Sequence, residues 1–489
     1  MAVRVIIGAK ERGGSLCDPI PDLDADQIAA GYAMADSGAK LLWSDPGAGK
    51  TLTALHAVAT VHQDYRANPK VLIVCPSIAV MTWVRWCRNV YVSLNIDCCI
   101  QYVDKGNRAV TPDANILIVT YGSLSRKSDK LLSALTDFSA DILICDESDN
   151  LTGLESARTE AVFGPAPEFS GGLASLSRWA WFLTGTPIPR YNDGLFPVLK
   201  SRFSNRLSSY QVNSYDRFVE TFCSTERVMY GKMSQPKEQI NGSRNNKLLR
   251  ELLFDGRAPI AIRIKLVMAD RPAHKEITIY PKFSKEYLRL EEEVCNPAMP
   301  WLTSDDEAAR VVDPRMTTAL RMMGTESAPE VVDIADEILA EKRAKRDVTG
   351  LLLLYWHKDA GDVLEAALKE RGWSVGRIDG STKQDNDAEV EAAFNCGDLD
   401  VVVGQIKSMG VALNLQGNCD TVIFAEETFS DAANQQAYQR VWRRGQERLV
   451  KVLWCRPLAA LADIKPGVAE RKRKGAAQVL DAVQTGGEQ

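Results

Sequence analysis

Two residues, Lys50 and Thr51, follow a turn whose composition could hold the phosphates of a nucleotide. A short apolar run leads into the Pro/Gly-rich turn at 44–49, and an amphipathic stretch begins at Leu52. A phosphate-binding loop requires this strand–loop–helix context, and the match departs only at Ser44, where the G-x-x-x-x-G-K-[ST] pattern has its first glycine. Backbone amides of the loop would point at phosphate oxygens, Lys50 would neutralise the β- and γ-phosphates, and the Thr51 hydroxyl would ligate Mg²⁺. We therefore predict a nucleoside triphosphate site, and an ordinary glycine-rich turn is the alternative.

Two acids at the end of an apolar strand could complete a hydrolytic site. Residues 141–145 lead directly into Asp146 and Glu147. Downstream of a phosphate-binding loop, Asp146 would hold Mg²⁺ through a water, and Glu147 would orient and deprotonate the attacking water. A pair of solvated acids is the alternative. A further strand, 181–183, ends in a hydroxyl-rich turn at 184–187 that suits sensing of the γ-phosphate.

Arginines late in the chain could act on the same phosphates. Arg440 and Arg443 are three residues apart, so on a helix both would point the same way. A pair of guanidiniums on one face is what arginine fingers require, although a basic helix can also be merely solvated. Upstream of the loop, the Gln27 amide both donates and accepts, so it could read an adenine edge or lie on an ordinary helix surface.

The elements that must position these residues alternate between strands and helices. Unbroken apolar runs predict buried strands at 71–76, 116–121, 141–145 and 181–183, with helical stretches between them. This alternation predicts a parallel sheet with ligand-binding loops at its carboxyl edge. The pattern from 188 to 350 is irregular and helical, apart from a strand-like run at 260–267. The α/β rhythm resumes at 351, with further strands at 351–356, 400–403 and 421–425 and an amphipathic helix at 359–371.

The bulk composition limits the class of protein. A chain of 489 residues is too long for one ordinary core. The net charge of −5 means that any surface for nucleic acid must be local, such as the basic cluster at 471–474. No apolar run approaches the ~20 residues of a membrane span, and the N-terminus lacks an apolar leader, so we expect a cytoplasmic protein, nucleoid-associated or nuclear in a eukaryote. Eleven cysteines without a C-x-x-C pair predict neither disulfides nor a zinc site.

These motifs, in this order, resemble the Snf2-like group of superfamily 2 helicases, most closely its annealing-helicase branch. The resemblance spans residues 23–455. Its most specific parts are residues 183–187 and 440–446, the second of which is similar to the R-x-x-R-x-G-Q of that group. The resemblance implies an α/β fold of two RecA-like parallel-sheet lobes with helical insertions between them.

The resemblance also implies roles for individual residues. Gln27 would serve adenine, and Gln446 would lie beside the fingers Arg440 and Arg443. Phosphates and magnesium would be bound by Gly47, Gly49, Lys50 and Thr51, and hydrolysis would be carried out by Asp146 and Glu147. Nucleic-acid contact or coupling would fall to Pro76, Thr120, Tyr121, Thr184, Gly185, Thr186, Gly380, Ser381, Gly410 and Asn414.

The departures from the pattern of the group concern coupling rather than hydrolysis. Asp149 stands where the group usually has a histidine that links hydrolysis to DNA engagement. Ala412 replaces a glycine of the coupling motif, and Arg190 replaces the usual asparagine after the 184–187 turn. Trp86 stands where an acid is common.

The same resemblance sets the expected domains and activity. We expect a short N-terminal segment at 1–20, a RecA-like ATP-binding lobe at 21–270 with a helical insertion near 200–258, a helical linker at 271–345, a RecA-like helicase C-terminal lobe at 346–460 and a basic tail at 461–489. The implied activity is a DNA-dependent ATPase that uses ATP and Mg²⁺ and translocates on duplex or branched DNA, with a protein partner or a DNA structure supplying specificity. The alternatives are a strand-separating DNA or RNA helicase and a regulatory nucleotide-binding subunit that grips DNA.

Overall fold

The described part of the chain forms two compact units. The computed structural model describes residues 3–7, 10–12, 20–45, 47–65, 68–103, 110–111, 113–126, 128–188, 191–228, 237–256, 258–266, 272–295, 314–380, 384–409, 413–428, 430–443, 446–459 and 461–462. Unit 1 contains the described residues up to Leu266, and unit 2 lies within Val267–Lys474. No helix among these residues is both long enough and apolar enough to cross a lipid bilayer.

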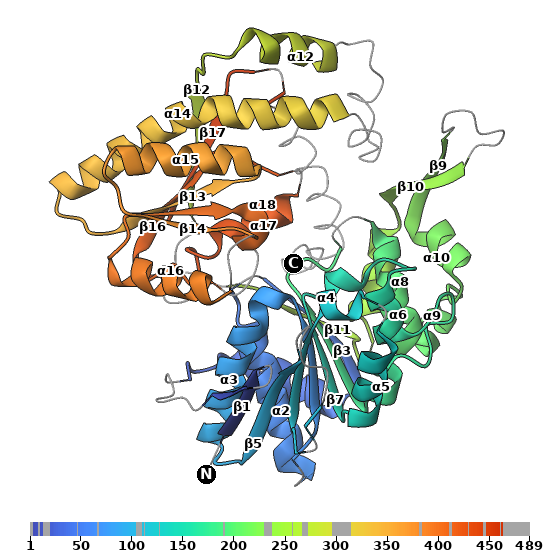
Figure 1. Ribbon diagram of the computed structural model, residues 1–489. Helices are drawn as coiled ribbons and strands as arrows, with labels where there is room; N and C mark the ends of the chain where they lie inside the picture. The colour runs from blue at the N-terminus through green and yellow to red at the C-terminus, as the bar shows by residue number, and fades with distance from the viewer. Residues whose placement is uncertain are drawn as a thin grey trace, which may run out of the picture. The chain divides into compact units, whose positions relative to one another are not determined.

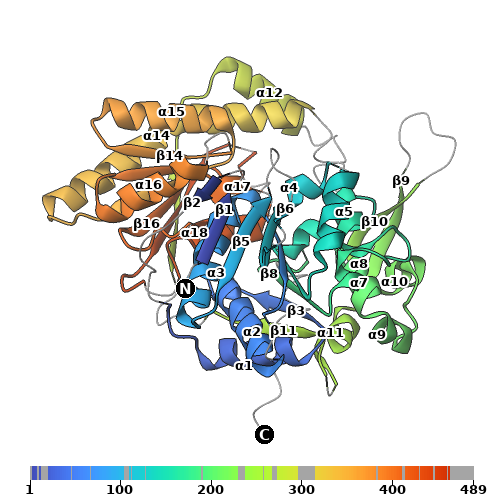
Figure 2. The same ribbon diagram turned by 60° about the horizontal axis from the view of Figure 1, so that its bottom comes forward.

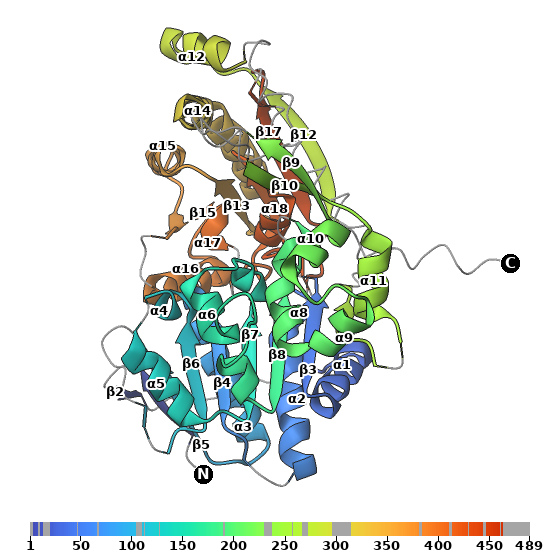
Figure 3. The ribbon, with the colours of Figure 1, turned by 90° about the vertical axis from the view of Figure 1, so that its right-hand side faces the viewer.

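Unit 1 is built on one mainly parallel sheet. Its strand order in the described residues is β11-β3-β8-β7-β4-β6-β5-β1-β2, and only the β1–β2 pair is antiparallel. The strands are β1 (Val3–Ile7), β2 (Lys10–Arg12), β3 (Ala39–Ser44), β4 (Val71–Cys75), β5 (Cys98–Val103), β6 (Ile116–Thr120), β7 (Ile142–Asp146), β8 (Trp179–Thr184) and β11 (Ala261–Ile264). Figure 2 shows β1, β5 and β6 side by side, and Figure 3 shows β6, β4, β7, β8 and β3. The central strands are buried along their whole length, which explains their unbroken apolar runs.

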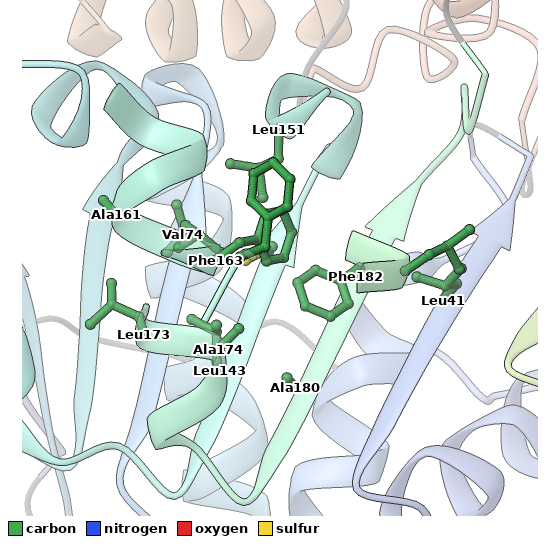
Figure 4. Close-up of a cluster of buried hydrophobic side chains, with 14 of the residues drawn as sticks. Leu41, Val74, Leu143, Leu151, Ala161, Phe163, Leu173, Ala174, Ala180 and Phe182 are labelled. Atoms are coloured by element: carbon green, nitrogen blue, oxygen red, sulfur yellow. The ribbon is translucent and has the colours of Figure 1, made fainter. Parts of the chain in front are cut away.

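Helices cover both faces of this sheet (Figures 1 and 3). The first three are α1 (Ala25–Asp36), α2 (Lys50–Tyr65) and α3 (Val80–Ser93), and the next four are α4 (Tyr121–Leu124), α5 (Asp129–Phe138), α6 (Ala157–Phe163) and α7 (Leu173–Leu176). Trp181 of β8 donates its indole N–H to the Met34 carbonyl of α1 at 3.0 Å, which ties α1 to one face. On the other face, Phe182 packs against Phe163 of α6 with ring centroids 5.4 Å apart, and Figure 4 shows this core with Leu173 of α7.

The segment between β8 and β11 is largely helical. It contains α8 (Phe196–Arg202), α9 (Ser204–Ser209), α10 (Tyr215–Phe222) and α11 (Asn246–Phe254). It also contains a two-stranded antiparallel hairpin of β9 (Cys223–Val228) and β10 (Lys237–Ser243), labelled at the right of Figure 1. After this insertion the chain returns to the sheet as β11, which pairs in parallel with β3.

Unit 2 is built on a second, parallel sheet. Within the described range its strand order is β12-β17-β16-β13-β15-β14. The strands are β12 (Ala273–Ile279), β13 (Gly350–Tyr355), β14 (Val375–Ile378), β15 (Val401–Gln405), β16 (Cys419–Phe424) and β17 (Lys451–Pro457). The helices are α12 (Lys285–Cys295), α14 (Pro314–Ala344), α15 (Lys358–Glu370), α16 (Gln384–Cys396), α17 (Ile406–Met409) and α18 (Asp431–Tyr438). Two apolar clusters lie on the two faces of β13, one packing the sheet against α14 and α15 and the other against α16, α17 and α18.

The two parallel sheets confirm the predicted α/β class. Two local predictions differ from the structure. Segment 271–345, expected as a helical linker, begins with β12, which extends the sheet of unit 2 by pairing with β17. Because β12 lies at the end of the sheet and most of its side chains are exposed, it needs no apolar run, and the sequence carries no signal for it. The insertion near 200–258 contains the β9–β10 hairpin as well as helices. The domain boundaries stay predictions.

Candidate active site

The phosphate-binding loop joins β3 to α2. Gly47 and Gly49 have φ angles of 83° and 86°, a conformation that side chains disfavour. A Cβ atom at Gly49 would lie 2.1 Å from Nε2 of Gln27. The positive φ therefore favours glycine at 49, and a side chain there would also displace the Gln27 amide. Lys50 is the first residue of α2, so the unpaired N–H groups of that helix start at the loop, as phosphate binding requires.

Gln27 holds this loop from the first turn of α1. It forms a capping box with Asp24. The backbone N–H of Gln27 donates to Oδ1 of Asp24 at 2.7 Å, and the backbone N–H of Asp24 donates to Oε1 of Gln27 at 2.9 Å. Nε2 of Gln27 donates to the carbonyl of Ala48 at 2.9 Å. Gln27 is 2% exposed, so its amide is engaged in shaping the loop, and its adenine contact stays a prediction. The D-x-x-Q spacing is a recognisable capping signal that the sequence analysis missed.

Glu147 lies just beyond β7, and its side chain contacts Lys50 of the loop. Its Oε1 lies 3.4 Å from Nζ of Lys50, and both side chains are mostly buried. Its Oε2 is buried and has no hydrogen-bond partner among the described residues. Glu147 adopts a left-handed conformation with φ of 48°, which turns it out of the strand direction. The carboxylate thus keeps one oxygen available for a water or a cation beside the phosphate-binding lysine.

Asp146 is the last residue of β7 and is almost fully buried. Trp83 of α3 donates its indole N–H to Oδ2 at 2.9 Å, and the Glu147 N–H donates to Oδ1 at 3.0 Å. The Tyr121 hydroxyl donates to the Asp146 carbonyl at 2.8 Å. Burial, with the adjacent Glu147 carboxylate second, raises the pKa of Asp146 to about 6. A bound divalent cation would offset this unfavourable burial of charge.

Asp149 lies within the single 3₁₀ turn Ser148–Leu151 that follows the acids. Thr184, at the end of β8, donates its hydroxyl to Oδ1 of Asp149 at 3.0 Å. The Thr186 N–H donates in turn to the Thr184 hydroxyl at 2.9 Å. The aspartate that replaces the expected histidine therefore ties the acidic segment to the 184–187 turn inside unit 1. Burial, followed by the Glu147 charge, raises the pKa of Asp149 to about 7.

This pKa predicts a pH-dependent stability. Because the pKa of Asp149 in the folded state lies above the ~3.9 of an unfolded aspartate, the unfolded state loses its proton first, and the fold is destabilised as pH rises from about 4 to about 7. Asp149→Asn keeps an acceptor for Thr184 but cannot ionise. We expect its melting temperature to exceed that of the wild type by a margin that grows from about pH 4 to about pH 7 and then levels off. Asp141→Asn serves as the control, and a margin that does not change with pH would contradict the argument.

The residues expected at the nucleic-acid backbone lie at the carboxyl edge of the sheet of unit 1. Pro76 follows β4 directly and precedes a 3₁₀ turn. Thr120, at the end of the neighbouring β6, caps α4 by accepting the Ser123 N–H at 3.2 Å. The Tyr121 side chain is 3% exposed, so through its hydroxyl it links this edge to the acidic segment. Nucleic-acid contact by these residues stays a prediction.

The two arginines of unit 2 do not share a helix face, contrary to the prediction. Helix α18 ends at Tyr438, and the chain then turns so that Val441 is buried in the core of unit 2. Arg440 donates Nε–H to the Gln436 carbonyl at 3.2 Å. Arg443 donates to the Leu413 carbonyl at 3.2 Å and to Oδ1 of Asn414. The helical spacing failed as a guide because core packing of the segment after α18 ended the helix.

Two other predicted residues of unit 2 lie at opposite edges of its sheet. Gln446 donates Nε2–H to the Cys419 carbonyl at 2.8 Å, which anchors it at the start of β16. A Cβ atom at Gly380 would lie 3.7 Å from Oγ of Ser408, so the end of β14 approaches α17. Four residues named in the sequence analysis, Arg190, Ser381, Gly410 and Ala412, lie outside the described residues.

Trp83 is a site residue whose role the sequence analysis missed. Its contact with Asp146 joins residues that are 63 positions apart. No local pattern predicts such a pair, because the contact depends on how α3 packs beside β7.

The chain matches two family models and several known proteins. Residues 29–290 match the family model described as SNF2-related domain, and residues 330–445 match the Helicase conserved C-terminal domain. The Chromodomain-helicase-DNA-binding protein 1-like of Danio rerio is 24% identical over 448 residues, which are 84% of this chain and 39% of that protein. The SWI/SNF-related matrix-associated actin-dependent regulator of chromatin subfamily A-like protein 1 of Bos taurus is 24% identical over 438 residues, 88% of this chain and 42% of that protein. A solved structure, the Sulfolobus solfataricus SWI2/SNF2 ATPase core in complex with dsDNA, matches with a TM-score of 0.40 and 17% identity, covering 94% of this chain and 96% of that one.

The family match decides the classification. This chain spans about two-fifths of the length of the two curated relatives. The SNF2-related match alone covers more than half of the 489 residues. The resemblance inferred from the motifs is therefore confirmed at the level of the family, whereas the annealing-helicase branch stays a prediction. The chain belongs to the SNF2-related family.

Proposed function

We propose that this chain is an ATP-hydrolysing motor that translocates on duplex or branched DNA. The observation that carries the proposal is the 3.4 Å contact between Lys50 of the phosphate-binding loop and Glu147, whose second oxygen is buried and unpartnered. A lysine for phosphate and a carboxylate for water at one place are the two groups that triphosphate hydrolysis requires. Family membership supports ATP as the nucleotide and DNA as the polymer.

The chain's own residues would divide the work of hydrolysis. Loop amides around Gly47 and Gly49 would bind the phosphates, and Lys50 would exchange its contact with Glu147 for the phosphate charge. The unpartnered Oε2 of Glu147 would accept a proton from the attacking water. Arg440 and Arg443 would supply positive charge in the transition state.

The donor set also fits Mg²⁺. Asp146 is a buried carboxylate whose pKa burial raises to about 6, and the orphaned oxygen of Glu147 lies next to it. Asp146 and the hydroxyl of Thr51 would hold the ion, which would neutralise charge on the phosphates. Both are oxygen donors, which Mg²⁺ prefers.

The polymer can be identified by ATPase assays with matched lengths of duplex DNA, branched DNA, single-stranded DNA and RNA. We expect duplex or branched DNA to stimulate turnover more than single strands, because the proposed contacts fall on the backbone of an intact duplex. The stimulation should fall steeply with salt and depend little on base sequence. A triplex-forming third strand should be displaced without separation of the duplex beneath it.

The outcomes of these assays distinguish the alternatives. Efficient unwinding of a tailed duplex, with RNA or single strands as the better activator, would favour a strand-separating helicase. ATP and DNA binding without net hydrolysis would favour a regulatory subunit. We also propose that a protein partner or a DNA structure supplies targeting, which pull-down with and without DNA would test.

A further inference from the structure

Asp45 joins the phosphate-binding loop to the end of the last strand of unit 1. It directly follows β3, and its carboxylate accepts two hydrogen bonds, from Nη2 of Arg263 at 2.7 Å and from the backbone N–H of Leu266 at 2.9 Å. Its own N–H donates to the Ile264 carbonyl at 3.0 Å. Main chain and side chain of one loop residue thus bind the same short segment, the carboxyl end of β11.

The same residue also fixes the middle of the loop. The Ala48 N–H donates to the Asp45 carbonyl at 3.0 Å, and the Ala48 carbonyl accepts from Gln27. Ala48 is therefore held on one side by the first turn of α1 and on the other by Asp45. A loop movement that accompanies phosphate binding would act on Asp45, and through it on Leu266.

The ion pair between Asp45 and Arg263 should be either fully formed or fully broken. The two side chains are 28% and 17% exposed, and Nε and Nη1 of Arg263 are buried without hydrogen-bond partners among the described residues. Because the guanidinium depends on Asp45, losing the pair leaves a largely buried cation without compensation. An intermediate arrangement, with the carboxylate partly withdrawn, would be unfavourable for the same reason.

We propose that Asp45 is a positioning residue that links occupancy of the phosphate-binding loop to the point at which the chain leaves unit 1. Leu266 is the last residue of unit 1 before the chain continues into unit 2. By reciprocity, if phosphate binding favours the closed Asp45–Leu266 contact, closing that contact raises the affinity of the loop for nucleotide. The inference rests on the proposed function, because it requires that the loop bind ATP.

A matched contact elsewhere in the sheet provides the control. Asp141, at the amino edge of the sheet, accepts the Lys70 N–H at 2.8 Å and so also clamps two strands with a carboxylate. It lies at the edge of the sheet opposite to the one that carries the loop. Asp141→Asn thus removes the charge from a comparable structural contact and leaves the proposed link intact.

Hydrogen exchange measured by mass spectrometry on the full chain tests the link. With a non-hydrolysable ATP analogue and Mg²⁺, we expect slower exchange at residues 47–53 and also at residues 261–266, which include the Leu266 amide. In Asp45→Asn and in Arg263→Gln, residues 47–53 should still be protected at saturating analogue, whereas the change at 261–266 should be lost. The affinity for the analogue should fall ~5-fold or more, within the usual range of coupling between sites. The double variant should bind no more weakly than Asp45→Asn, because the ion pair lost in Arg263→Gln is already lost in Asp45→Asn.

Each outcome of this experiment has a distinct meaning. Protection at 47–53 in the wild-type protein without any change at 261–266 would overturn the link while leaving the proposed function in place. No protection at 47–53 would overturn the proposed function and the link with it. A nucleotide effect at 261–266 that persists in Asp45→Asn would also overturn the link. The wild-type measurement alone is decisive if the variants fail to fold, and Asp141→Asn should behave as the wild type.

Discussion

Glu147→Gln is expected to bind ATP and to hydrolyse it at least ~10²-fold more slowly than the wild-type protein, the scale of losing a general base. The amide keeps the size of the side chain and an acceptor for Lys50, which contacts Oε1 at 3.4 Å. It cannot take a proton from water at the position of the unpartnered Oε2. Single-turnover hydrolysis and nucleotide binding, measured on the same preparation, separate the two effects.

Two comparisons make this result specific. Glu155→Gln removes an exposed carboxylate eight positions downstream and should leave turnover unchanged. Lys50→Ala should weaken nucleotide binding as well as turnover, because it removes the phosphate-binding charge. Wild-type turnover in Glu147→Gln would contradict the assignment of the base.

Arg443→Ala and Arg440→Ala are each expected to reduce turnover in the presence of DNA, by as much as ~10³-fold if the guanidinium acts on the transition state. Neither residue lies in the phosphate-binding loop, so ATP affinity should change far less than turnover. Steady-state assays at saturating ATP, together with equilibrium binding of nucleotide, give both quantities.

The control must account for the structural contacts of Arg443. This arginine also holds Leu413 and Asn414, so its loss removes packing as well as charge. Arg448→Ala removes an exposed guanidinium that donates to the Gly417 carbonyl at 3.4 Å and should leave turnover close to that of the wild type. If neither Arg440→Ala nor Arg443→Ala lowers turnover with DNA present, these residues are not fingers.

Local patterns in the sequence were sufficient to predict the central strands of unit 1 and to place two acids at the end of one of them. The run predicted at 71–76 corresponds to β4, Val71–Cys75, because a strand buried on both faces must be apolar along its whole length. The acids at the end of β7 were identifiable for the same reason: parallel strands present their carboxyl ends on one edge, where ligands bind. Local composition and a simple topological rule were enough for these features.

Contacts between distant parts of the chain were not predictable from such patterns. The Thr184–Asp149 hydrogen bond joins residues 35 positions apart, and the Arg263–Asp45 pair joins residues 218 positions apart. Helical spacing suggested a shared face for Arg440 and Arg443, but tertiary packing ended α18 at Tyr438. These features depend on which elements become neighbours in space, and no short segment of the sequence shows which elements those are.

The position of β11 limits how this protein can be cut into fragments. Every expected motif of unit 1 lies before residue 188, which makes a shorter fragment ending there attractive for expression. In the sheet, however, β3 is flanked by β8 on one side and by β11 on the other. Truncation before Ala261 would make β3, the strand that leads into the phosphate-binding loop, an exposed and apolar edge strand. Such an edge strand promotes aggregation. A soluble nucleotide-binding fragment therefore has to retain the whole helical insertion and extend through Leu266.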